Sequence, residues 1–136
     1  MREYVFKAPV RFTHTDPAGY VFFPRFFEMF QAAVEDWFSY GMGVNYADLI
    51  LEKGIGLPTA HAECDFKAPV KLGELIEFTL TLEKLGTSSI TIIIAGRVNG
   101  EERLRAKLVL VAIELVNGRP VPLSDLLRKK MESFQS

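Results

Sequence analysis

The segment 15–24 contains the residues whose types and spacing are best suited to chemistry. Asp16 begins the turn D-P-A-G, and the apolar spacing of a long helix starts close to Phe23. Pro24 suits the first turn of such a helix, where a missing N–H costs nothing. The first N–H groups of a helix have no partner within it, so the amide of Phe23 can stabilise a developing negative charge. A carboxylate beside free amides is the minimum equipment for attack on a thioester, because the thiolate leaves readily.

Asp16 also has a purely structural interpretation. An Asp followed by Pro-Ala-Gly is typical of an Asx-turn, in which the carboxylate accepts hydrogen bonds from the nearby backbone and the chain reverses. From these residues alone both interpretations stay open, and the helix that follows favours the catalytic one.

Other familiar catalytic patterns do not occur in the sequence. It contains no G-x-S-x-G elbow, no Walker loop and no dinucleotide fingerprint. His14 and His61 lack the paired spacing of a metal site, and His61 is expected to be a structural or surface residue in a strand. Cys64 lies in an apolar strand pattern, where a cysteine is usually a small buried hydrophobe. As the single cysteine it excludes an internal disulfide and favours a reducing, cytoplasmic location.

Length and composition indicate one soluble folded domain, expected to span residues 1–136. The chain has room for a single core, and its 49% hydrophobic and 24% charged residues are typical of globular proteins. A formal net charge of −1 with scattered Lys and Arg argues against nucleic acid as a partner. No run approaches the ~18 apolar residues that cross a bilayer, which argues against a membrane partner.

The first half of the chain is expected to supply a strand and two helices. Apolar residues alternate over 4–12, which predicts a strand with one buried face. Apolar residues then recur at i, i+3, i+4 and i+7 over 23–38, the pattern of a helix. This helix is apolar nearly all round, so we expect other structure to wrap it. A shorter helix is expected over 46–53.

The second half is expected to be a meander of four strands and a final helix. The strands are expected over 57–68, 75–83, 89–98 and 103–116. Asn99-Gly100 is the strongest two-residue hairpin signal in the chain. The final helix is expected over 125–134, capped by Ser124. One long apolar helix with about five strands predicts an α+β architecture in which a curved antiparallel sheet wraps the helix.

The sequence resembles the 4-hydroxybenzoyl-CoA thioesterase family of acyl-CoA thioesterases, which have the hot-dog fold. The stretch FTHTDPAGYVFFPRFF resembles the family's active-site segment: a strand end, D-x-x-G, a short hydrophobic run and an aromatic-rich helix. The resemblance continues through 54–58 and 65–74 and covers the chain from about Phe6 to Val116. It implies an acyl-CoA thioester hydrolase.

The resemblance also implies roles for particular residues. Asp16 would be the catalytic carboxylate, acting as nucleophile or as general base, and the backbone N–H of Phe23 would polarise the thioester carbonyl. No metal or bound cofactor is implied, since coenzyme A arrives as part of the substrate. The residues expected to bind substrate are Val21, Phe22, Phe26, Gln31, Ser88 and Ser89.

The helix residues among these have alternative interpretations. Phe22, Phe26 and Phe27 could wall a pocket near Asp16 that suits aromatic or medium acyl groups better than acetyl, but aromatic stripes at helical spacing are also typical of plain core. Gln31 could hydrogen-bond an acyl substituent, or be a buried side chain satisfied by backbone.

The binding of the coenzyme A phosphates poses a separate problem. Relatives place Arg or Lys at the third hairpin, whereas residues 86–89 here offer the hydroxyls of Ser88 and Ser89, and amides, but no charge. Phosphate binding would rely on these groups, on Lys67 or Lys71, or on the basic run 128–130. A solvated helix end, favoured by the helix dipole, explains that run equally well.

Three other activities are compatible with the same fold. A non-catalytic acyl-CoA binding or sensing module would bind without turnover, and Asp16 argues against it. A thioesterase acting on acyl groups held by a carrier protein stays open. A hot-dog enoyl-CoA hydratase would pair the Asp with a His five residues later, where this chain has Val21.

The strand patterns predict self-association. Residues 89–95 carry no charge and residues 108–113 are apolar on both faces, so the sheet needs cover that one helix does not supply. Two-fold association into a homodimer, or a homotetramer, is the simplest solution. The resemblance implies active sites at subunit boundaries, with Asp16 of one chain facing Ser88 and Ser89 of another.

Overall fold

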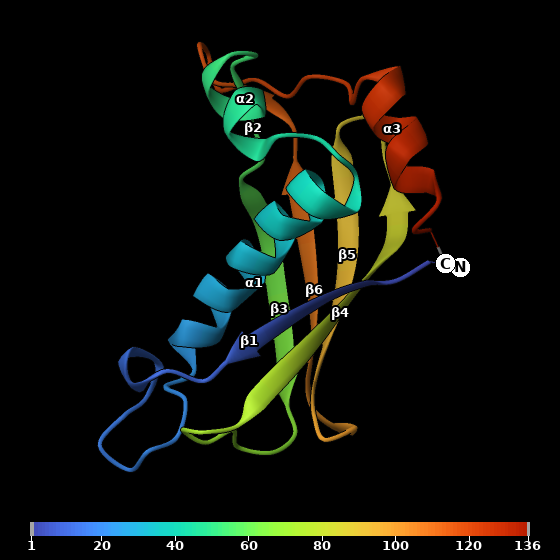
Figure 1. Ribbon diagram of the computed structural model, residues 1–136. Helices are drawn as coiled ribbons and strands as arrows, with labels where there is room; N and C mark the ends of the chain where they lie inside the picture. Colours follow the sequence, from blue (N-terminus) through green and yellow to red (C-terminus); the bar gives the residue numbers. More distant parts are fainter. Residues whose placement is uncertain (1, 136) are drawn as a thin grey trace.

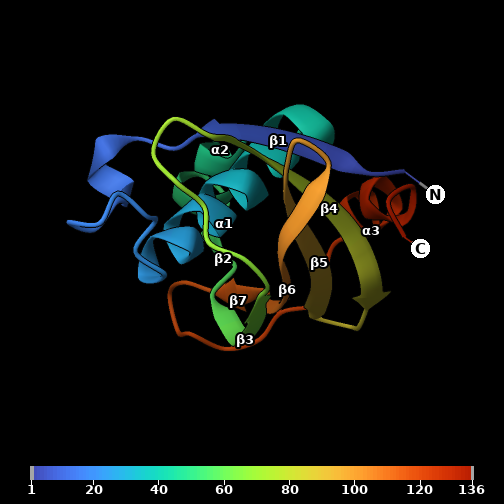
Figure 2. The same ribbon diagram turned by 90° about the horizontal axis from the view of Figure 1, so that it is seen from below.

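The computed structural model describes residues 2–135, which form a five-stranded antiparallel sheet curved around one helix (Figures 1 and 2). The strand order is β1-β4-β5-β6-β3. The five strands are β1 (Tyr4–Pro9), β3 (Thr59–Phe66), β4 (Leu75–Leu85), β5 (Ser89–Val98) and β6 (Glu101–Val111). A separate two-stranded sheet pairs β2 (Ile55–Gly56) with β7 (Ile113–Glu114). The α+β class and the wrapped helix expected from the sequence are confirmed.

The helices also follow the sequence pattern. The central helix α1 (Pro24–Asp36) continues into a π-helical turn over Trp37–Gly41, and α2 (Tyr46–Leu51) follows it. The last helix, α3 (Asp125–Glu132), is capped as expected, because the Ser124 hydroxyl accepts a 3.1 Å hydrogen bond from the N–H of Leu127. No helix within residues 2–135 combines the length and the apolarity needed to cross a bilayer.

The expected four-strand meander is wrong in one respect. β4, β5 and β6 do form consecutive hairpins, but β3 pairs with β6 at the edge of the sheet and not with β4. Burial explains the placement. Almost every residue of β3 is exposed, which suits an edge, whereas β4 alternates buried and exposed residues as an interior strand does. The segment between β3 and β4 therefore crosses the end of the sheet.

The first strand is shorter than its pattern predicts. β1 ends at Pro9, and residues Phe12–His14 form a 3₁₀ turn that carries the Phe12 ring into solvent, where it is 80% exposed. The hairpin at Asn99-Gly100 is confirmed. Its two residues have φ angles of 49° and 80°, the positive values that a two-residue turn between twisted strands requires.

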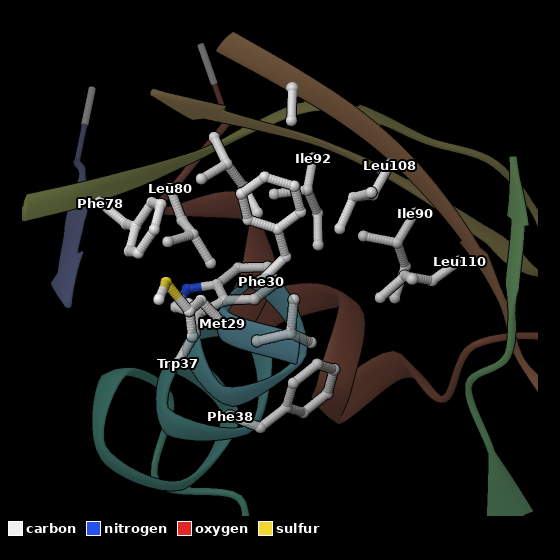
Figure 3. Packing of buried hydrophobic residues seen from close by; sticks show 14 of the residues in the cluster. Met29, Phe30, Trp37, Phe38, Phe78, Leu80, Ile90, Ile92, Leu108 and Leu110 are labelled. Atoms are coloured by element: carbon white, nitrogen blue, oxygen red, sulfur yellow. The ribbon is translucent and has the colours of Figure 1, made fainter. Parts of the chain in front are cut away.

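The core lies between α1 and the concave face of the sheet (Figure 3). Met29 and Phe30 from the helix face Phe78 and Leu80 on β4, and the rings of Phe30 and Phe78 meet edge to face at 5.7 Å. The opposite side of the helix has no such cover, since Phe27 keeps 38% of its surface exposed. One chain therefore wraps only one side of the apolar helix.

Candidate active site

The two oxygens of the Asp16 carboxylate have different environments. Oδ1 accepts hydrogen bonds from the N–H groups of Ala18 at 2.9 Å and Tyr20 at 3.3 Å, so the Asx-turn interpretation is confirmed. Gly19 completes this turn with a φ of 83°, a value that glycine adopts without strain. Oδ2 has no hydrogen-bond partner within residues 2–135. The turn therefore fixes one oxygen and leaves the other available for chemistry.

Backbone hydrogen bonds fix the Asp16 turn to the segment that connects β3 and β4. The N–H of Val21 donates to the carbonyl of Val70 at 2.8 Å, and the N–H of Leu72 donates to the carbonyl of Gly19 at 3.0 Å. Thr15 also forms a β-bridge with Val21. The position of the carboxylate thus depends on the conformation of residues 67–74.

A partly buried ion pair holds that connecting segment. Arg103 on β6 donates to both oxygens of Glu74, at 3.3 and 3.4 Å, and to the carbonyl of Pro69 at 2.6 Å. Glu74 also accepts a 2.7 Å hydrogen bond from the N–H of Lys71. That backbone bond, with Arg103 beside it, lowers the pKa of Glu74 below its ordinary value. The segment beneath the Asp16 turn is therefore tied to the central sheet.

The amide of Phe23 is free at the start of α1. Arg25 and Phe26 donate to the carbonyls of Phe22 and Phe23, and Pro24 has no N–H. The N–H of Phe23 has no hydrogen-bond partner in the described part of the chain. Phe23 itself has helical backbone angles, so its N–H belongs to the first unpaired set of the helix. The structure thus has the free donor that the sequence predicts.

An aromatic cluster lines a cavity of about 320 Å³ at the same end of the helix. The ring of Phe66, the last residue of β3, lies 6.2 Å from the ring of Phe23 and 5.6 Å from that of Phe26. The cavity is lined by Val21, Phe23, Phe26, Phe66, Lys67, Ala68, Pro69 and Val70. The sequence did not predict a role for Phe66, because its ring reaches Phe23 and Phe26 only through a contact between segments far apart in the chain. Its place in the family-like segment 65–74 was the only signal.

Phe22, Phe27 and Gln31, which were also expected near the substrate, lie outside this cavity. Phe22 is 50% exposed and packs on Phe23, and Phe27 packs on Phe30; neither lines the aromatic cavity. Gln31 is exposed and donates to Glu35 at 3.0 Å and to the Tyr46 hydroxyl at 3.4 Å. The interpretation of Gln31 as a buried side chain satisfied by backbone is therefore wrong. It lines a different, acidic hollow of about 690 Å³ between β1, α1 and α2.

The turn between β4 and β5, next to Ser88 and Ser89, lies at the opposite end of the sheet from the segment between β1 and α1, which contains Asp16 (Figure 1). Pro9, near the Asp16 turn, pairs with Leu75 at the start of β4, whereas the serines follow the end of that strand. Ten residue steps along a strand correspond to about 33 Å. A single chain therefore does not bring the predicted catalytic and hairpin residues together.

Neither the histidines nor the cysteine forms a hydrogen bond with Asp16 within residues 2–135. The Nδ1 of His14 accepts from the N–H of Arg11 at 2.9 Å, and burial lowers the pKa of this His. His61 lies exposed on β3, 3.2 Å from Glu63, as a surface residue. Cys64 is half-buried, and burial raises the pKa of its thiol to about 11. Within residues 2–135 no three metal-ligating side chains group together.

Known proteins resemble this chain over nearly its whole length. A 1,4-dihydroxy-2-naphthoyl-CoA hydrolase from Synechococcus elongatus is 26% identical over 129 residues, which cover 94% of each chain. The crystal structure of a 1,4-dihydroxy-2-naphthoyl-CoA thioesterase from Synechocystis is 25% identical, with a TM-score of 0.85 over 96% of each chain.

A thioesterase superfamily structure from Jannaschia sp. CCS1, 24% identical, reaches a TM-score of 0.90 over 98% of this chain and 93% of that one. These likenesses confirm the hot-dog arrangement. The family model described as the Thioesterase-like superfamily matches residues 10–131. The expected enzyme class, an acyl-CoA thioester hydrolase, is confirmed with it. The chain belongs to the thioesterase-like superfamily.

Proposed function

We propose that this protein hydrolyses an acyl-CoA thioester with Asp16 as its catalytic carboxylate. One observation before and at the start of α1 supports the proposal. One carboxylate oxygen of Asp16 accepts hydrogen bonds from the turn, whereas the other oxygen and the N–H of Phe23 have no hydrogen-bond partner within residues 2–135. An N–H at a helix start stabilises the oxyanion that forms when a thioester carbonyl is attacked.

Two routes use these same groups. In one, Oδ2 of Asp16 attacks the carbonyl carbon, the C–S bond breaks with loss of coenzyme A thiolate, and water hydrolyses the resulting anhydride. In the other, Oδ2 removes a proton from water, the hydroxide adds to the carbonyl carbon, and the C–S bond of the tetrahedral intermediate breaks with loss of coenzyme A thiolate. Both give the free acid and coenzyme A, and neither needs a metal or a bound cofactor. We therefore expect turnover to survive treatment with a chelator.

The proposed acyl group is aromatic. The aromatic cavity beside the Phe23 amide has three phenylalanine rings, which suit a flat acyl group by stacking and edge contacts. Two similar proteins are named for hydrolysis of 1,4-dihydroxy-2-naphthoyl-CoA, which carries a bicyclic aromatic acyl group. We propose an aryl-CoA substrate on these two grounds.

The proposed active unit is a homodimer at minimum. β3 is an exposed edge strand, and the apolar helix beside it is covered on one side only. If two β3 strands pair antiparallel about a two-fold axis, the Thr59 end of one lies opposite the Phe66 end of the other. Thr59 and Ile90 both pair with Leu110, so this end carries Ser88 and Ser89. Such pairing brings the hairpin serines of one copy toward Asp16 of the other.

A thiol-release assay tests the proposed function. A panel of benzoyl-CoA, 1,4-dihydroxy-2-naphthoyl-CoA, acetyl-CoA and long-chain acyl-CoA is incubated with the purified protein, with and without a chelator. We expect turnover of the aryl-CoAs in both conditions, with a kcat/KM above that of acetyl-CoA. Binding of aryl-CoA without release of thiol would instead identify a non-catalytic module.

A further inference from the structure

The guanidinium of Arg103 on β6 contacts the segment 67–74 at two separate points. Its Nη1 donates to the carbonyl of Pro69 at 2.6 Å, and its Nη2 donates to Oε2 of Glu74 at 3.3 Å. The two acceptors lie five residues apart in the sequence, and both bind nitrogens of one rigid, planar group. The Arg103 side chain keeps only 15% of its surface exposed, so solvent screens these contacts less than it screens surface pairs. One side chain therefore fixes two parts of the segment relative to each other and to the sheet.

The Pro69 contact lies one residue from a hydrogen bond to the Asp16 turn. The next carbonyl, that of Val70, accepts from the N–H of Val21 at 2.8 Å. Val21 also forms the β-bridge with Thr15, the residue before Asp16. Only the two backbone dihedrals of Val70 separate its carbonyl from that of Pro69, so the position of the first carbonyl limits that of the second. This is one route from the guanidinium to the carboxylate.

The Glu74 contact reaches the turn by a second route. Oε1 of Glu74 accepts from the N–H of Lys71 at 2.7 Å. The next N–H, that of Leu72, donates to the carbonyl of Gly19 at 3.0 Å. Gly19 in turn donates its own N–H to the carbonyl of Asp16 at 3.0 Å. Because the guanidinium holds the Glu74 side chain that orients the Lys71 amide, both sides of the Asp16 turn depend on the same cation.

Lys107 provides a comparison on the same strand and the same face of the sheet. It lies four residues beyond Arg103 and pairs with Glu83 on β4 at 3.0 Å. Its side chain forms no hydrogen bond to residues 67–74 in the part of the chain that the structure describes. Removing a guanidinium and a carboxylate from water offsets much of their attraction, so the less exposed pair of Arg103 and Glu74 contributes geometry more than stability.

We infer that Arg103 is a positioning residue, which holds the Asp16 carboxylate at the distance from the thioester carbonyl that attack requires. The inference rests on the proposed function, since it names what fixes the proposed catalytic group. Arg103 acts through the segment 67–74, because within residues 2–135 its side chain forms no hydrogen bond to Asp16 itself. A displacement of about 1 Å at a reacting group can lower a rate by about 10²-fold. Loss of Arg103 should therefore lower kcat more than it weakens substrate binding.

Steady-state kinetics on benzoyl-CoA and acetyl-CoA test this role. The wild type is compared with Arg103→Ala, Arg103→Lys and the control Lys107→Ala. We expect Arg103→Ala to lower kcat by about tenfold or more on both substrates and to change KM by less than about twofold. Arg103→Lys keeps the charge beside Glu74 but lacks the planar fork, so it should recover part of kcat, and Lys107→Ala should change neither constant. A wild-type kcat in Arg103→Ala, or a loss confined to KM, would overturn the inference.

Amide hydrogen exchange measured by NMR tests the same coupling without turnover. The N–H groups of Val21 and Leu72 should exchange about tenfold faster in Arg103→Ala, because the segment that they pair with opens locally. The N–H of Ile92, on the central strand β5, should keep its protection. Unchanged exchange at Val21 and Leu72, or equal acceleration at Ile92, would overturn the inference.

Two further outcomes keep the test decisive. If Arg103→Ala does not fold, Arg103→Lys is measured in its place, and smaller changes of the same sign in kcat and in exchange are expected; no change in either would overturn the inference. If the wild type hydrolyses no thioester but exchange at Val21 and Leu72 responds as expected, the proposed function fails, whereas the coupling between Arg103 and the Asp16 turn stands.

Discussion

At the scale of single residues, the candidate active site at the start of α1 is defined by the hydrogen-bond donors and acceptors that are left unpaired. The D-P-A-G turn uses one oxygen of Asp16 for its own conformation, so the same residue can build the turn and still present a free oxygen. The Asx-turn of Asp16 is therefore compatible with the proposed catalytic role of the same residue. Which oxygen is free could not be predicted, because it depends on the rotamer that the turn selects.

Phe66 provides the residue-scale prediction on specificity. Phe66→Ala removes the ring that packs on Phe23 and Phe26, so the aromatic cavity loses one of its flat walls. We expect kcat/KM for benzoyl-CoA to fall by about tenfold, since aromatic pairs contribute about 1 kcal/mol beyond the apolar area that they bury. The value for acetyl-CoA should change little.

The control for this variant is Phe12→Ala. Phe12 is more exposed than Phe66 and lies on the 3₁₀ turn outside the cavity, so its removal should alter neither substrate. A Phe66→Ala variant that loses activity equally on both substrates would argue that the ring supports folding and not aryl recognition.

At the scale of elements, the sequence predicts the secondary structure of each segment better than it predicts which strands pair. The strand 89–98 is predicted with its bounds, because alternating isoleucines identify a half-buried strand locally. The pairing of β3 with β6 was not predicted. The backbone groups of β4 and β6 are equally able to pair with β3, and tertiary packing determines which of them does so. Phe66 was missed for the same reason, because its ring packs on Phe23 and Phe26, which lie far along the chain.

An ion cluster at the β3–β6 end gives an element-scale prediction on pH. Glu102 on β6 pairs with Arg105 at 2.9 Å and with Lys67, just after β3. These partners, Arg105 first, lower the pKa of Glu102 to about 2. A depressed carboxyl pKa stabilises the fold above the unfolded-state pKa, and this contribution is lost as pH falls through the folded-state value.

Glu102→Gln should therefore lower the free energy of unfolding at neutral pH by on the order of 1 kcal/mol, reduced by solvent screening. The difference from wild type should shrink as the pH is lowered from about 5 toward 2, where the native carboxylate also becomes protonated. Urea unfolding at several pH values measures it. Glu83→Gln, which removes one exposed partner of Lys107, is the control. A difference that stays constant down to the lowest pH would contradict the ion-pair origin.

At the scale of the whole molecule, a single chain has the exposed sheet edge and the half-covered helix that are typical of one subunit of an oligomer. The predicted catalytic end and the turn between β4 and β5, which carries Ser88, lie at opposite ends of the sheet, and β3 leaves an exposed edge between them. We expect analytical ultracentrifugation at micromolar concentration to give a dimer or tetramer. A fully active, monodisperse species near 15.3 kDa would overturn both the oligomer and the shared site.

A charge on each sheet edge locates the interface. Ala62→Asp places a carboxylate at the centre of β3, where two-fold pairing would bring it beside its own copy, so we expect dissociation and loss of turnover. Val5→Asp makes the same chemical change on β1, the opposite edge, and should leave the assembly intact. If Val5→Asp dissociates the oligomer and Ala62→Asp has no effect, the interface lies on the β1 edge, and the proposed pairing of two β3 strands is wrong.

The most direct measurement of the central claim compares wild type and Asp16→Asn on benzoyl-CoA by thiol release and by calorimetry. The Asn side-chain oxygen can still accept from Ala18 and Tyr20, so the fold and the Kd should be retained, with the latter changing less than about threefold. Because the free anionic oxygen is gone, kcat should fall by about 10²-fold or more. An Asp16→Asn variant that hydrolyses benzoyl-CoA at close to the wild-type rate would contradict the assignment of Asp16.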